Sequence, residues 1–83
     1  MRLDIRYFAW LRERIGQGAE TIETTATTVD ELVADLKSRD EGHAAAFADM
    51  KAVRVALDQD LSDFSASLKG VREVAFFPPM TGG

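Results

Sequence analysis

The apolar residues of this chain change their period from two to about 3.6 and back to two, and this order constrains the fold more than any other feature. Residues 2–8 and 19–25 alternate apolar with polar side chains, which predicts two half-buried strands. Residues 9–15 suit a short helix between them, because two glycines follow shortly afterwards and favour its end. The first 25 residues are therefore predicted to form two strands joined by a short helix.

The strongest helix signal starts at Thr28. Thr28 and Glu31 have the spacing of a capping box, in which Thr28 is the N-cap. An apolar stripe at helical spacing follows, formed by Val29, Leu32, Val33 and Leu36. We expect Gly42 to end this helix and residues 43–49 to form a further helical turn or two. His43 has no obvious partner nearby in the sequence, so we expect it to be exposed at the start of that turn.

The second half returns to the period of two. Residues 53–57 predict a third strand, and after a turn residues 61–64 predict a short extended piece. Residues 72–77 predict a last strand that is apolar on both faces, which suits a central position under a helix. Pro78 and Pro79 lack an N–H donor and should end its pairing.

Two strands, a crossing helix and further strands on that helix make the β-grasp plan. We therefore expect an α+β, ubiquitin-like fold with a mixed sheet of four to five strands packed on one main helix. Residues 1–79 should form this domain and residues 80–83 a flexible carrier tail that ends in Gly-Gly.

Composition excludes several kinds of site. The 83 residues suffice for one small domain. The absence of cysteine excludes disulfides, thiolate zinc sites and a cysteine nucleophile, and a single histidine argues against a structural metal. No apolar run approaches the roughly 20 residues of a membrane span, and the N-terminus lacks a signal peptide. We therefore expect a cytoplasmic protein. The net charge of −4 argues against nucleic acid and anionic membranes as partners.

The end of the chain carries the most specific motif. Residues 73–83, with Phe-Phe-Pro-Pro-x-Thr-Gly-Gly, resemble the end of molybdopterin synthase small subunits, the MoaD-type sulfur carriers. Residues 7–13 and 56–61 also resemble the family, although the family often has asparagine where this chain has Asp58. A terminal Gly-Gly alone is a weak signal, whereas the combination at the end of a chain of this length is a strong one.

The resemblance implies a carrier whose working group is the C-terminal carboxylate of Gly83, next to Gly82. In the family this carboxylate is adenylated with ATP by an adenylyltransferase of the ubiquitin-activating type and becomes a thiocarboxylate. The sulfur then passes to cyclic pyranopterin monophosphate and builds the molybdopterin dithiolene. The resemblance implies a large synthase subunit as partner, in a heterotetramer of two small and two large subunits. It implies neither a bound cofactor nor catalysis by this chain alone.

Strand parity predicts where a partner would bind. Phe8 and Phe77 should lie on the sheet face opposite the helix, where two aromatic rings would form an exposed apolar patch unless a loop covers them. Leu61, from the short extended piece, is a further candidate for this patch. The expected partner-binding residues are Phe8, Leu61, Phe77, Pro78, Pro79, Met80 and Thr81.

Two other functions share these features. The first is a sulfur carrier for thiamine synthesis or tRNA thiolation, which the Phe-Phe-Pro-Pro-x-Thr motif disfavours. The second is a ubiquitin-like modifier joined to lysines of other proteins, or a plain interaction module. A thiocarboxylate on the chain end would indicate a sulfur carrier, and linkage to other proteins would indicate a modifier.

Overall fold

The computed structural model describes residues 1–79. The predicted tail, residues 80–83, lies outside the described residues. Within residues 1–79, none of the helices has the length and apolar content to cross a membrane. The elements in chain order are β1 (Arg2–Tyr7), α1 (Ala9–Ile15), β2 (Ala19–Glu23), α2 (Val29–Lys37), α3 (Glu41–Ala46), the 3₁₀ turn η1 (Met50–Ala52), β3 (Arg54–Leu57), β4 (Asp60–Ser62) and β5 (Glu73–Phe77).

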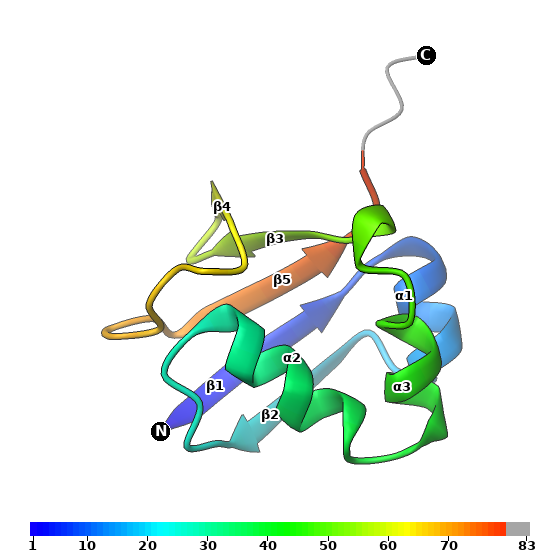
Figure 1. The fold of residues 1–83 in the computed structure, drawn as a ribbon, viewed down its shortest axis with the longest axis horizontal. Coiled ribbons are helices and arrows are strands. Elements are labelled where there is room, and N and C mark those ends of the chain that lie inside the picture. Colours follow the sequence, from blue (N-terminus) through cyan, green and yellow to red (C-terminus); the bar gives the residue numbers. More distant parts are fainter. Residues whose placement is uncertain (80–83) are drawn as a thin grey trace.

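One mixed sheet of five strands forms the body of the molecule, in the order β2-β1-β5-β3-β4 (Figure 1). The first and last strands, β1 and β5, run parallel, and the other neighbouring strands are antiparallel. Tyr7 lies opposite Phe76, and Phe77 lies opposite Arg54. The α+β β-grasp prediction and the central place of the last strand are therefore confirmed.

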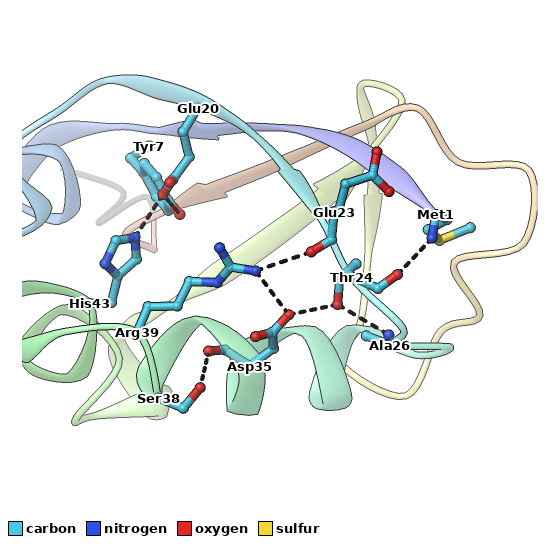
Figure 2. Close-up of polar contacts among 10 residues, drawn as sticks. All are labelled: Met1, Tyr7, Glu20, Glu23, Thr24, Ala26, Asp35, Ser38, Arg39 and His43. Atoms are coloured by element: carbon cyan, nitrogen blue, oxygen red, sulfur yellow. Dashed lines mark hydrogen bonds and ion pairs between the residues drawn. The ribbon is translucent and has the colours of Figure 1, made fainter.

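The core lies between the sheet and the helices α2 and α3, which pack on the same side of it (Figures 1 and 2). Alternation along β1 directs Leu3, Ile5 and Tyr7 into this core, as their spacing predicts. The helix α2 buries its predicted stripe, formed by Val29, Leu32, Val33 and Leu36. The helices cover one face of the sheet, so the side chains on the opposite face are available for a role other than packing the core.

Of the two hydrogen bonds of the predicted capping box at the start of α2, one is present and the other differs. The Thr28 hydroxyl accepts the backbone N–H of Glu31 at 3.3 Å, as an N-cap should. The Glu31 carboxylate, however, accepts the backbone N–H of Thr27 at 2.7 Å, one residue before the expected one. The Thr27 hydroxyl donates to the same carboxylate oxygen, so two groups of Thr27 hold the Glu31 side chain in this position.

Gly42 does not end the main helix, so that prediction is wrong. The helix α2 ends at Lys37, with Ser38 as its C-cap, and Gly42 lies inside α3. A Cβ at Gly42 would lie 2.8 Å from the backbone oxygen of Arg14 in α1. Glycine is therefore needed here for the close approach of two helices, not for a turn.

Candidate functional site

The sheet face opposite α2 carries exposed aromatic and aliphatic side chains. Phe8 follows Tyr7 at the end of β1, and its backbone N–H donates to the oxygen of Phe76 at 3.1 Å, which joins it to β5. The Phe8 side chain is 49% exposed, whereas Phe77 beside it is half-buried. The prediction that these two aromatics share the face away from the core agrees with the strand register.

Leu61 reaches the same face from the far edge of the sheet. It lies opposite Ala56 of β3, and Ala56 lies opposite Ala75 of β5. Leu61 is 75% exposed. The two alanines were not predicted as part of the site, since the pairing of non-consecutive strands brings them there. We call Phe8, Ala56, Leu61, Ala75 and Phe77 the open-face patch.

Charged residues lie beside the open-face patch. Arg6 lies opposite Ala75, and its Nε donates to Glu73 Oε2 at 3.0 Å. Arg54 lies opposite Phe77, and its guanidinium donates to the backbone oxygens of Lys51 and Val53, both at 3.0 Å. An apolar centre with a charged rim is the usual composition of a protein-binding surface.

The chain leaves the sheet next to this patch. The chain leaves the sheet at the end of β5 (Figure 1). Pro78 and Pro79 follow β5 directly, and both are half-buried. The predicted site residues Met80, Thr81, Gly82 and Gly83 lie outside the described residues. The described part of the candidate site is therefore the open-face patch together with the two prolines that lead from it.

A two-residue turn positions the start of β5. The Asp58 carboxylate accepts the backbone N–H groups of Arg72 at 3.0 Å and Glu73 at 2.9 Å, and the Asp58 N–H donates to the oxygen of Glu73. Asp58 and Gln59 have φ values of 50° and 72°, both in the left-handed region. Residues 58–60 were predicted only as a turn, and the link from Asp58 to β5 was not.

His43 is buried, so the prediction of an exposed histidine is wrong. Its side chain lies between two carboxylates. Nε2 is 2.7 Å from Glu20 Oε2 (Figure 2). Nδ1 is 2.8 Å from Asp40 Oδ1. The Tyr7 hydroxyl donates to the same Glu20 oxygen at 2.7 Å. The sequence held one signal for this burial, because His43 shares a helical stripe with Ala46 and Phe47, which are also buried.

Within residues 1–79, no group of three histidine or acidic side chains lies close enough together to hold a metal ion. The open-face patch likewise contains apolar side chains and no nucleophile. Its arrangement suits binding of a protein surface, with any chemistry carried elsewhere on the chain.

Comparisons with known proteins identify the family of the chain. The family model described as the ThiS family matches residues 5–83. Two relatives named molybdopterin synthase sulfur carrier subunit, from Escherichia coli and Haemophilus influenzae, are each 35% identical over 81 residues, which cover 98% of this chain and 99% of the relative. The crystal structure of SAMP1 from Haloferax volcanii has the same fold, with a TM-score of 0.74, 19% identity and 100% coverage of both chains.

Proposed function

This chain belongs to the ThiS family, and on that premise we propose that it is a sulfur carrier for molybdopterin synthesis. One observation carries the proposal: the match to two molybdopterin synthase sulfur carrier subunits extends over 98% of the chain. The sequence motif at residues 76–83 lies within the matched region and supports the same conclusion.

The proposed chemistry takes place at the carboxylate of Gly83. A carboxylate is a poor acyl donor, because oxide is a poor leaving group. Attack of this carboxylate on ATP releases pyrophosphate and forms an acyl-adenylate. Sulfur at the oxidation level of sulfide then displaces AMP from the acyl carbon, which leaves a thiocarboxylate without a redox step. The thiocarboxylate sulfur attacks a carbon of cyclic pyranopterin monophosphate and displaces an oxygen substituent, which joins carrier and substrate as a thioester. Water cleaves the acyl C–S bond of this thioester, so the sulfur stays on the substrate and the carboxylate is returned.

The residues before Gly83 suit delivery of this group. Gly82 and Gly83 carry no Cβ, so we propose that they enter a narrow active site of the partner together with Met80 and Thr81. Pro78 and Pro79 restrict the backbone where the chain leaves the sheet. The chain is then a carrier and not a catalyst, because the reacting group is one that it hands over.

We propose that the open-face patch docks on the large subunit of molybdopterin synthase. The exposure of Phe8 and Leu61, with Phe77 between them on β5, provides apolar area beside the point where the chain leaves the sheet. The proposed assembly has two small and two large subunits, and a second partner is the adenylyltransferase that activates Gly83. Both encounters are proposed to take place in the cytoplasm.

Removal of Gly83 tests the carrier role. We expect the shortened chain to form no thiocarboxylate with the adenylyltransferase, ATP and a sulfur donor. Its terminal carboxylate would belong to Gly82, one residue short of the position at which the enzyme activates Gly83. The full chain should show by mass spectrometry the replacement of one oxygen by sulfur. Thermal melting should be the same for both chains, since the described core ends at Phe76.

Three results would contradict the proposal. A normal thiocarboxylate on the shortened chain would show that Gly83 is not the reacting residue. Attachment of the full chain to lysines of other proteins, without a thiocarboxylate, would indicate a protein modifier. A carrier for thiamine synthesis or tRNA thiolation would form the thiocarboxylate but give no molybdopterin when mixed with the large subunit and its substrate.

A further inference from the structure

The cluster of Tyr7, Glu20, Asp40 and His43 joins three parts of the fold and has no role in the proposed sulfur transfer. Tyr7 lies on β1, Glu20 on β2 and His43 on α3, and Asp40 is the N-cap of α3. The His43 residue is 3% exposed, so its ring is almost withdrawn from water (Figure 2). A buried titratable group that links separate elements can make their contact depend on pH.

Hydrogen bonding determines the charge of the ring. Both ring nitrogens of His43 lie within 2.8 Å of carboxylate oxygens. An ionised carboxylate only accepts hydrogen bonds, and a neutral imidazole can donate from only one nitrogen. The Tyr7 hydroxyl already donates its proton to Glu20. The arrangement is therefore satisfied when His43 is an imidazolium that donates to Glu20 and Asp40 at the same time.

The surrounding charges support this assignment. Burial disfavours the charged ring, but the hydrogen bonds and charges of Glu20 and Asp40 outweigh it and raise the pKa of His43 above its usual 6.5. Burial and the bond to Glu20 raise the pKa of Tyr7, so its hydroxyl stays a donor. Arg39 lies next to the cluster, but its guanidinium bonds to Asp35 and to the backbone of Glu23 (Figure 2).

Loss of the proton would break one bond in preference to the other. The Asp40 side chain is 59% exposed, against 16% for Glu20, so Asp40 can turn into water at lower cost. A neutral ring would therefore keep its proton on Nε2, facing Glu20, and present a lone pair at Nδ1 to Asp40. The same Asp40 oxygen also accepts the backbone N–H of His43, which is the N-cap bond of α3.

We propose that His43 is a proton-controlled latch, which in its charged form holds α3 on β2 and on losing its proton releases the Asp40 cap and loosens α3. Contacts between aromatic rings connect the latch to the strand before the tail. The ring of Tyr7 contacts His43 edge-on at 6.0 Å between centroids and stacks on Phe76 at 6.1 Å. Phe47, directly after α3, contacts the same Phe76 ring at 4.9 Å. The latch stands on these contacts and does not depend on the sulfur-carrier proposal.

The direction of the pH effect follows from the raised pKa of His43. Below about pH 6.5 the histidine is protonated in both the folded and the unfolded chain, and the latch contributes its full stability. Above this value the unfolded chain loses the proton first. Each further pH unit then lowers the folding equilibrium constant by at most about tenfold, until the folded chain also loses the proton.

Nuclear magnetic resonance on the full chain tests the latch directly. His43 is the only histidine, so one pair of ring ¹⁵N signals reports its titration. We expect both nitrogens to have imidazolium shifts below the midpoint of the titration, and we expect that midpoint to lie above 6.5. Amide hydrogen exchange at His43 and Ala44 of α3, corrected for the intrinsic effect of pH, should accelerate with the same midpoint. A midpoint at or below 6.5, or a rate of amide exchange in α3 that does not change with the titration of His43, would overturn the proposal.

Two variants separate the latch from charge in general. His43→Gln removes the titrating group, so its folding equilibrium constant should lack the decline that the unmodified chain shows above about pH 6.5. Lys51→Gln removes one exposed positive charge outside the cluster and should keep that decline. Equal pH profiles for His43→Gln and the unmodified chain would also overturn the proposal. Should His43→Gln fail to fold, the titration and exchange of the unmodified chain still decide.

Discussion

Phe76 and Phe77 are consecutive residues with different environments. Phe76 is fully buried, stacked on Tyr7 and in edge contact with Phe47. Phe77 points to the opposite face and forms part of the open-face patch. Neighbouring positions on one strand thus have different roles, because Phe76 stabilises the core and Phe77 is proposed to bind a partner.

Replacement of each phenylalanine by alanine should separate these roles. Phe76→Ala should lower the free energy of unfolding by about 3–5 kcal/mol, because it leaves a cavity among packed rings. Phe77→Ala should cost about 1 kcal/mol or less of stability but weaken binding of the large subunit by about 2 kcal/mol or more. Urea unfolding and calorimetric titration measure the two effects. Equal losses of stability would show that the proposed division between core and patch is wrong.

At the scale of elements, the turn between β3 and β4 supports the strand that leads to the tail. Both of its central residues, Asp58 and Gln59, have positive φ, the combination of a type I′ turn. Asparagine and aspartate tolerate this region better than other side chains do. The Asp58 carboxylate also holds the first N–H groups of the β5 segment, so one side chain serves both the turn and the sheet.

Two substitutions at Asp58 test this double role. Asp58→Asn keeps a side-chain oxygen and the tolerance of positive φ, so it should change the free energy of unfolding by about 0.5 kcal/mol or less. Asp58→Ala removes the acceptor of two N–H groups and should cost about 1–3 kcal/mol. The midpoint of urea unfolding gives both values. A loss for Asp58→Asn as large as that for Asp58→Ala would show that the oxygen is unimportant.

The elements were predictable because their signals are local. The period of two in residues 2–8 and the cap and stripe after Thr28 lie within one strand or helix. Gly42 and His43 were misread because their decisive contacts come from distant segments. Gly42 meets the backbone of Arg14 in α1, and His43 meets Glu20 at a separation of 23 residues. Local spacing does not identify the distant partners, although the helical stripe of His43 with Ala46 and Phe47 was a signal for burial of the histidine.

The candidate site was predictable to a similar extent. Parity along two strands was enough to place Phe8 and Phe77 on one face. The contribution of Ala56 and Ala75 depends on which strands are neighbours, and this order is not written in any single segment. The residues of the tail were predicted from their motif alone, and their role stays a prediction.

At the scale of the whole molecule, acidic groups limit stability at low pH and His43 limits it at high pH. Hydrogen bonds lower the pKa of Glu31, Asp35, Asp40 and Asp63 from their ordinary values of 4.5 and 3.8. These groups contribute stability above those values, and the contribution is lost as pH falls through their lowered pKa values. The raised pKa of His43 has the opposite sign, because its contribution is lost as pH rises.

The unmodified chain should therefore be most stable on a plateau between about pH 4.5 and 6.5, the ordinary pKa values of glutamate and histidine. Thermal melting in buffers of equal ionic strength across this range measures the profile. Stability should decline on both sides of the plateau. A steady rise of the melting temperature from neutral to alkaline pH would show that His43 does not stabilise the fold through its charged form.

The strand order also has a consequence while the chain is being made. β5 lies at the centre of the sheet, between β1 and β3, yet a ribosome synthesises it after the other four strands of residues 1–79. Until it emerges, β1 and β3 each have an unpaired edge, and the aromatic core lacks Phe76. The domain therefore folds only when the segment immediately before the tail is available, and a nascent chain halted earlier would be an incomplete sheet open to proteases.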